Sequence, residues 1–268
     1  MDKFTKEKVL EYFNGDELAT DVWIEKYALT NEEGIRLEET PNDMLMRIAK
    51  EFERIEKKKY GNDGLTADEI FYAFTGGGKI SDGFVIPQGR PLFGIGNNFS
   101  NVTIANCFVI PQPEDSYSSI LQSEERMISI MKRGGGVGCD LSSLRPSGFP
   151  VKNSAKTTSG VVSFMKRYSN GVNECAQNGR RGASMLSYDV EGIDVEKFIT
   201  SKADHTSITG ANISVKISDS FMDAVKENKT YKQFFKKIEK KPSIIEGFQV
   251  ERDGDLTTYS REVPAVDI

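Results

Sequence analysis

The hydrophobic positions of the first 79 residues recur at helical spacing. Spacings of three and four predict a helix with one buried face, formed by Leu45, Ile48, Phe52 and Ile55. Thr40 and Asp43 precede that face as a capping box, with proline between them at the first helical position. We therefore expect residues 1–79 to form a helical region, and no catalytic pattern stands out in it.

From residue 80 the pattern changes to short apolar runs that are separated by Gly, Pro and Asn and alternate with helical periods. We expect strands at 84–87, 102–110, 183–188 and 212–217. We expect helices at 116–131, 161–175, 195–202 and 219–228. This alternation predicts an α/β fold with a mainly parallel sheet over residues 80–228. Residues 229–268 are lysine-rich and predict an extended tail without core.

Composition and charge exclude several classes of protein. The chain has 268 residues and a formal net charge of -5, which argues against general nucleic-acid binding. No apolar run approaches the roughly 20 residues of a membrane span, and the start lacks a signal-peptide core. The cysteines, Cys107, Cys139 and Cys175, lack metal-type spacing, and His205 is the one histidine. We expect a cytoplasmic protein that uses its cysteines as thiols and binds no metal through them.

Cys107 has two readings. It lies in an apolar run broken by Asn106, and a buried cysteine in such a run is usually an inert small hydrophobe. A polar break beside a cysteine also suits the wall of a pocket. For Cys139 and Cys175 we expect inert, buried thiols.

Two glycine-rich segments are candidates for anion binding. Residues 133–138 carry four glycines, which permit close approach of backbone N–H groups to an anion or a sugar, or simply a tight turn from helix to strand. The segment matches neither a P-loop nor a Rossmann fingerprint. Residues 177–182 combine glycines with Arg180 and Arg181, which suits either bidentate phosphate contacts or a solvated surface turn.

Short motifs in one order resemble the large (catalytic) subunit of ribonucleotide reductase. They are PQGRP at 87–91, NCFVI at 106–110, GGGVG at 134–138, SSLRP at 142–146, RRGA at 180–183 and NISV at 212–215. The resemblance runs from Trp23 to about Ala224. It implies a helical region followed by the first half of a ten-stranded α/β barrel, and reduction of a ribonucleotide at its 2′ carbon by radical chemistry. The glycine-rich and RRGA forms are most similar to adenosylcobalamin-dependent members.

The resemblance also implies roles in the active site. Cys107 matches the redox-active cysteine on the first barrel strand, which becomes half of a disulfide as substrate is reduced. Asn106 and Gly136 match positions whose backbone lies against substrate. Arg90 stands where the family often places Ser or Thr near the substrate phosphate.

An effector site for a deoxynucleotide or ATP is implied as well. Its residues would be Asp115, Ser116 and Arg145, followed by a first specificity loop at 146–155. The second specificity loop would be 177–182, with Gln177, Arg180 and Arg181 passing effector identity to the substrate base. A carboxylate reads donors of the base or sugar, while an arginine holds phosphate.

The family's ATP cone, its radical cysteine and the disulfide partner of Cys107 find no match in these residues, since no cysteine follows Cys175. We expect the N-terminal part of a catalytic subunit, a split or truncated chain that is inactive without a complementary reductase chain. Other expected partners are a ribonucleotide, a thioredoxin- or glutaredoxin-like reductant and a second copy of the chain. The radical source is either adenosylcobalamin or a metal-containing radical-generating subunit. Alternative interpretations are a stand-alone deoxynucleotide-binding module and an unstable remnant.

Overall fold

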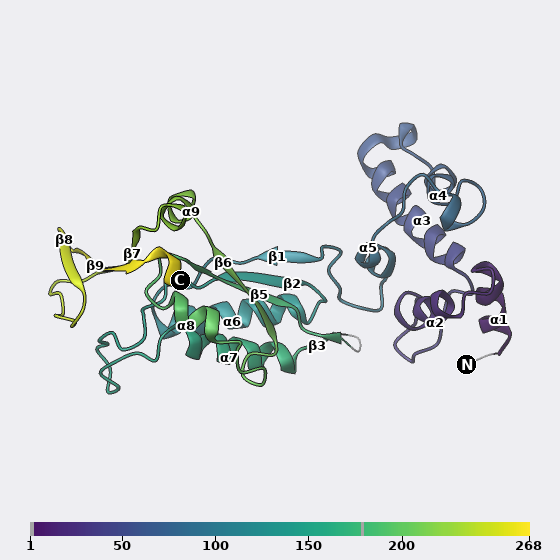
Figure 1. Cartoon of the computed structure of the whole chain (residues 1–268). Helices are drawn as coiled ribbons and strands as arrows, with labels where there is room; N and C mark the ends of the chain where they lie inside the picture. Colours follow the sequence, from purple (N-terminus) through teal and green to yellow (C-terminus); the bar gives the residue numbers. More distant parts are fainter. Residues whose placement is uncertain (1–2, 178–179) are drawn as a thin grey trace. The chain divides into compact units, whose positions relative to one another are not determined.

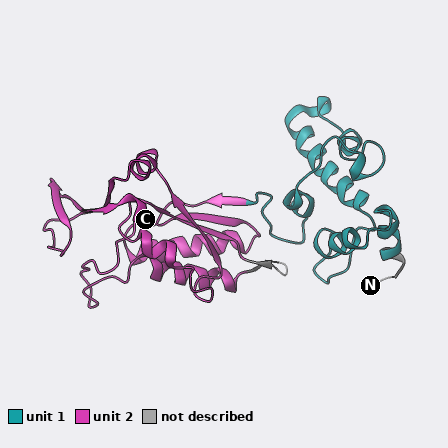
Figure 2. Ribbon diagram, viewed as in Figure 1, with its two compact units in different colours: residues 1–106 teal, residues 107–268 magenta. Residues whose placement is uncertain are grey.

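The computed structural model describes residues 3–177 and 180–268, in two compact units (Figure 2). The first unit ends at Asn106 and the second begins at Cys107. The sequence predicted the change from helical to mixed structure earlier, at residues 79–80. Within the described ranges, no helix is both long and apolar enough to cross a membrane.

The first unit consists of helices joined by short loops (Figure 1). Its α-helices are α1 (Lys3–Tyr12), α2 (Glu17–Lys26), α3 (Pro41–Tyr60), α4 (Ala67–Thr75) and α5 (Gly89–Gly94), with 3-10 turns at Gly61–Asp63 and Ile80–Asp82. The Asp43 carboxylate accepts the backbone N–H of Thr40 at 2.8 Å, which confirms the predicted start of α3. The buried core includes Trp23, Ile24, Leu45, Ile48 and Phe74.

The buried face of α3 is shorter than its apolar pattern predicts. Leu45 and Ile48 are fully buried, but Phe52 and Ile55 are 39% and 45% exposed. The buried residues of α3 all lie in its first half, although Phe52 in the second half still contacts Phe74 of α4. Periodicity identifies the apolar side of a helix but not how much of its length is covered.

The strand expected at 84–87 does not form. The backbone N–H groups of Phe84 and Val85 both donate to the carbonyl of Ala73, and the two side chains are 76% and 52% exposed. The strand expected at 102–110 is reduced to β1 (Cys107–Val109), the part that pairs with a neighbouring strand. An apolar run becomes a strand only where its backbone finds a partner.

The second unit is built on a four-stranded sheet with the order β1-β2-β5-β6, in which every pairing is parallel. The other strands are β2 (Gly136–Asp140), β5 (Ser184–Asp189) and β6 (Ala211–Lys216). Its helices are α6 (Tyr117–Met131), α7 (Val161–Glu174), α8 (Val195–Thr200) and α9 (Asp219–Lys226). In Figure 1, α6, α7 and α8 lie along one face of the sheet, where the largest core packs around Met127, Leu141, Met165, Leu186 and Phe198. The predicted parallel α/β sheet is confirmed.

Two further strand pairings complete the second unit. The short strands β3 (Ala176–Gln177) and β4 (Arg180–Arg181) pair antiparallel. A separate antiparallel sheet has the order β7-β9-β8, formed by β7 (Thr230–Ile238), β8 (Gln249–Asp253) and β9 (Leu256–Pro264), and a 3-10 turn at Ala265–Asp267 follows.

This C-terminal sheet corrects the expectation of an extended tail without core. Tyr231, Phe235 and Tyr259 are buried, in two clusters that also include Phe149 and Phe221. The buried residues of β7, Tyr231, Gln233 and Phe235, occupy every second position, and this period of two is typical of a strand with one covered face. The lysine content concealed the alternation.

Candidate functional site

Cys107 begins β1 and lies at the edge of the parallel sheet. It is an exposed free thiol, and its partner across the sheet is Gly136, the first residue of β2. Adjacent strands are about 4.8 Å apart, and Gly136 has no side chain that could cover the Cys107 thiol. The structure therefore brings these two predicted residues together, and the pocket-wall interpretation of Cys107 agrees with its exposure better than the buried one.

The other two cysteines have different surroundings. Cys139 is 2% exposed on β2, and burial, with a smaller contribution from the charge of Asp140, raises the pKa of its thiol to about 12. Cys175 is half-buried at the end of α7, and burial raises the pKa of its thiol as well. A reacting thiol must be accessible, so the exposed Cys107 is better placed for chemistry than Cys139 or Cys175.

Asn106 and Arg90 belong to the first unit. The Asn106 side-chain amide donates to Gln88 Oε1 at 3.1 Å, and Gln88 directly precedes α5, which carries Arg90 as its second residue. Asn106 is thus bonded to the segment that holds Arg90, and it is the chain neighbour of Cys107. Contact of either residue with substrate stays a prediction.

The predicted effector residues Asp115 and Arg145 are bonded to each other. Arg145 Nε and Nη2 lie 2.8 and 2.7 Å from Asp115 Oδ2, and the backbone N–H of Arg145 donates to Asp115 Oδ1 at 3.1 Å. The Arg145 side chain is 13% exposed and that of Asp115 is 27% exposed. A pair with this many bonds and little solvent is well ordered and close to charge-neutral.

The bonds of Arg145 extend to the following loop. Its Nη1 donates to the carbonyl of Pro150, and the Ser143 hydroxyl donates to the carbonyl of Pro113. The segment before α6 is thereby joined to the segment after β2. Ser116 is the N-cap of α6, where its hydroxyl accepts the backbone N–H of Ser119 at 3.2 Å. The positive end of the α6 dipole therefore lies next to the Asp115–Arg145 pair.

Gly134 and Gly135 lie in the turn between α6 and β2, and Gly136 begins β2. A side chain at Gly135 would come within 2.6 Å of Ile130 and 2.8 Å of Phe108. Gly134 has a left-handed backbone with φ +88°. Of the two interpretations of this segment, the tight turn is the one that its packing supports.

The second predicted loop is described only in part. The backbones of Gln177, Arg180 and Arg181 belong to β3 and β4, but Asn178 and Gly179 lie outside the described residues, as do the side chains of 176–181. Gly182 is required by packing, because a Cβ there would lie 2.7 Å from the carbonyl oxygen of Val172. Effector contacts by Gln177, Arg180 and Arg181 stay predictions.

Comparison with known proteins decides the family. Residues 105–264, more than half of the chain, match the model of the ribonucleotide reductase barrel domain, and residues 13–90 match that of the ribonucleotide reductase all-alpha domain. The chain belongs to the ribonucleotide reductase family. The family predicted from the motifs is confirmed, and the fold is a helical region followed by a parallel α/β sheet of the barrel domain. In the described part of the chain, the four parallel strands form an open sheet and not a closed barrel.

Named relatives match less than half of this reductase chain. A vitamin B12-dependent ribonucleoside-diphosphate reductase of Mycobacterium tuberculosis is 39% identical over 127 residues, 47% of this chain and 18% of the relative. A vitamin B12-dependent ribonucleotide reductase of Streptomyces avermitilis is 32% identical over 149 residues (46% and 15%). The ribonucleoside-diphosphate reductase subunit alpha of Bacillus subtilis is 28% identical over 137 residues (49% and 19%). The chain thus spans less than a fifth of the length of these relatives.

The reductase chain has a charged cluster that sequence reasoning missed. Lys216 Nζ on β6 lies 2.8 Å from Asp140 Oδ2 on β2 and 3.3 Å from Asp189 Oδ2 on β5. Burial alone would raise the pKa of Asp140, but bonds from Lys216 and Ser142 outweigh it, and the pKa is lowered. Each of these residues is the last residue of its strand, and the three strands are parallel neighbours. Charged residues at the carboxyl ends of successive parallel strands were therefore the sequence feature that could have predicted this cluster.

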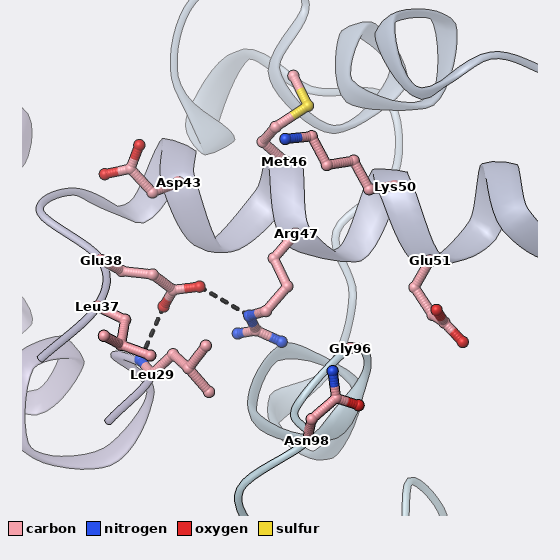
Figure 3. Close-up of a pocket in the computed structure, with 10 residues that line it drawn as sticks. All are labelled: Leu29, Leu37, Glu38, Asp43, Met46, Arg47, Lys50, Glu51, Gly96 and Asn98. Carbon is pink, nitrogen blue, oxygen red and sulfur yellow. Dashed lines mark hydrogen bonds and ion pairs between the residues drawn. The ribbon is translucent and has the colours of Figure 1, made fainter. Parts of the chain in front are cut away.

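The first unit of the reductase chain contains a pocket of about 480 Å³ beside α3 (Figure 3). Glu38 Oε1 pairs with Arg47 Nε at 2.7 Å, and Glu38 Oε2 accepts the backbone N–H of Leu29 at 2.8 Å. Arg47 also donates to the carbonyls of Leu92 and Ile95. These bonds join α3 to the chain around α5, so the buried pair serves the fold. Among residues 3–177 and 180–268, no group of three or more His, Cys, Asp or Glu side chains is arranged to hold a metal.

Proposed function

We propose that this chain is the N-terminal part of a ribonucleotide reductase catalytic subunit, which reduces ribonucleotides to deoxyribonucleotides for DNA synthesis. The observation that carries the proposal is the exposed thiol of Cys107 beside Gly136, within a chain of this family. Exposure at a strand end, next to a residue without a side chain, is what a thiol needs to reach a ribose.

The proposed reaction needs two thiols. The 2′ hydroxyl of the ribose leaves as water, a hydrogen takes its place on the 2′ carbon, and two thiols are oxidised to a disulfide. Cys107 supplies one thiol. Cys139 is buried, and no cysteine follows Cys175, so we place the second thiol and the radical cysteine outside these 268 residues. A thioredoxin- or glutaredoxin-like dithiol restores the reduced pair.

We also propose a deoxynucleotide or ATP effector site at Asp115, Ser116 and Arg145. Support comes from their convergence, because Arg145 is held against Asp115 beside the N-terminus of α6. A guanidinium group and a helix N-terminus both favour phosphate, while the carboxylate can accept donors of a base or sugar. Gln177, Arg180 and Arg181 are proposed to extend this site.

Nucleotide binding tests the effector site. Titration calorimetry of the chain with dATP, dGTP, dTTP and ATP should show saturable binding, and Arg145→Ala should weaken it by about tenfold or more. Arg54→Ala is the matched control, because Arg54 forms an exposed ion pair with Glu51 in the first unit. Binding unchanged in Arg145→Ala, or absent from the unaltered chain, would contradict the proposed effector site.

A second candidate function is deoxynucleotide sensing without catalysis. The Asp115–Arg145 pair lies within one compact unit that has its own core, so it can bind a nucleotide without the missing thiols. A polypeptide that completes the barrel distinguishes the two candidates: the catalytic subunit should then turn over substrate, and the sensor should not. An unstable remnant fits less well, since both units bury extensive cores.

The radical source is proposed to be adenosylcobalamin, with a metal-containing subunit as the alternative. Two relatives carry vitamin B12 dependence in their names. In the pocket of the first unit, Glu38 and Arg47 are bonded to each other and serve the fold. We assign no described residue to the cofactor. The three free cysteines agree with the proposed cytoplasmic location.

A further inference from the structure

The loop that follows Arg145 is a small hairpin with a bonded stem and an exposed tip. In the stem, the Gly148 N–H donates to the carbonyl of Thr158 at 2.9 Å, and the Val151 N–H donates to the carbonyl of Lys156 at 2.7 Å. Residues 152–157 form the exposed tip. The stem alone gives the loop its shape, but not its position relative to Arg145.

Asp194 fixes one side of this stem. Its side chain is 2% exposed, and Oδ2 accepts the backbone N–H of Ser147 at 2.7 Å. A side chain at Gly160, where the loop ends, would come within 2.6 Å of the same oxygen. A buried carboxylate is stable only when its oxygens are bonded, so the Ser147 bond is difficult to give up.

Phe149 holds the same stem through its ring. Its ring is 3% exposed and makes edge-to-face contacts with three rings, those of Phe235, Phe248 and Tyr259, at centroid distances of 5.8, 5.3 and 5.3 Å. Phe235 and Tyr259 lie on β7 and β9 of the C-terminal sheet, and Phe248 directly precedes β8. Edge-to-face aromatic pairs have a preferred geometry, so this cage holds the ring in one orientation.

A direct bond connects the caged ring to the effector residue. Pro150 follows Phe149, and the Pro150 carbonyl accepts Arg145 Nη1. A shift of Phe149 therefore moves an acceptor of the guanidinium group that is proposed to hold phosphate. Asp194 acts on the same loop through Ser147, two residues after Arg145.

We infer that Phe149 and Asp194 are positioning residues for the effector site. Together they connect the C-terminal sheet and the start of α8 to the loop beside Arg145, and so set the geometry with which that loop recognises a deoxynucleotide. The inference rests on the proposed effector function of Arg145. Contacts beyond the ligand-binding residues commonly set how well those residues are held.

The test measures nucleotide affinity and the protection of the loop amides from hydrogen exchange in the same variants. Phe149→Ala should raise the dissociation constants for dATP, dGTP and dTTP by about tenfold, and Phe149→Leu by less, because it keeps part of the apolar volume. Asp194→Asn should also raise these dissociation constants. Hydrogen exchange of the Ser147 and Gly148 amides should become faster in each variant.

Phe221→Ala is the matched control. Phe221 is also buried and makes an edge-to-face contact with Tyr231 of the same C-terminal sheet, but it belongs to a different cluster from Phe149. The Phe221→Ala variant should have a lower melting temperature but unchanged nucleotide affinity and unchanged hydrogen exchange at the Ser147 amide. This separates a positioning role from a general loss of stability.

The outcomes distinguish this inference from the function on which it rests. If the unaltered chain binds nucleotide and both Phe149→Leu and Asp194→Asn bind it equally well, the positioning role is overturned and the effector site stands. If the unaltered chain binds none of the nucleotides, both are overturned. Weaker binding with faster stem exchange, and no change in the control, supports the inference.

Discussion

Single residues on neighbouring strands differ widely in their chemistry. Cys107 on β1 and Cys139 on β2 belong to one sheet, yet the first is exposed and the second is buried with a pKa of about 12. The sequence led us to expect inert, buried thiols at Cys139 and Cys175; Cys139 is buried, whereas Cys175 is half-buried. The sequence left open whether Cys107 is buried, because an apolar run has the same composition in a core strand and in an edge strand.

Alkylation should follow this difference. With iodoacetamide at pH 8, Cys107 should be modified first, Cys175 more slowly, and Cys139 only when the chain unfolds, because the raised pKa of Cys139 leaves almost no thiolate. Peptide mass spectrometry over time gives the three rates, and Cys107→Ser should remove the fast phase. Equal rates for Cys107 and Cys139 would contradict the described exposure.

Two glycines near Cys107 should respond differently to alanine. Gly135→Ala places a Cβ within 2.6 Å of Ile130 and 2.8 Å of Phe108, and we expect it to lower the free energy of unfolding by about 1–3 kcal/mol. Gly138→Ala meets its nearest atom at 3.8 Å, so a change within about 0.5 kcal/mol is expected. Urea unfolding of both variants measures this, and equal losses would show that the turn does not require Gly135.

At the scale of elements, strands and helices with clear periods were predicted well. β5, β6, α6 and α7 all form close to their expected ranges, because period and caps agree in each. The run at 84–87 does not form a strand, because a strand needs a partner strand whose position local patterns do not encode. The C-terminal sheet was missed since its lysines share β7 with the buried rings of Tyr231 and Phe235.

Contacts between elements were the hardest features to predict from the sequence. The resemblance pointed to Asp115 and Arg145 separately, but not to their direct bond. The Asp140–Lys216 pair joins strands β2 and β6, which are not neighbours along the chain. Such pairs depend on sheet order and register, which local patterns do not encode.

The Asp140–Lys216 pair should make stability depend on pH. The pKa of Asp140 is lowered in the folded chain, so its contribution is present above the ordinary Asp pKa of about 3.9 and is lost as the pH falls through the folded value. Asp140→Asn should lower the free energy of unfolding by on the order of 1 kcal/mol at pH 7, since Lys216 is half-exposed and its pairing is screened by water. The difference in this free energy between the variant and the unaltered chain should shrink below about pH 4.

Unfolding in urea at pH 7, 5 and 3 measures this dependence. Asp223→Asn is the control, because Asp223 forms an exposed pair with Lys226 at 3.7 Å and should have little effect at any of these pH values. A loss in Asp140→Asn that stays constant from pH 7 to pH 3 would show that the carboxylate charge is not the cause.

At the scale of the whole molecule, the chain consists of two units that each bury their own core. The proposed chemistry and the proposed effector site both lie in the second unit, with Cys107 at its first residue and Arg145 in the loop after β2. Arg90 and Asn106 lie in the first unit, and their contacts with substrate stay predictions. The proposed reaction also needs a thiol that these residues do not offer.

Turnover with a completed barrel tests the proposed role of the chain most directly. The chain is mixed with a polypeptide that supplies the remaining barrel strands and cysteines, together with adenosylcobalamin, a dithiol reductant and ribonucleoside di- or triphosphates, and deoxyribonucleotide is measured by chromatography. We predict product with the unaltered chain and with Cys175→Ser, and none with Cys107→Ser. Full activity of Cys107→Ser would contradict the account.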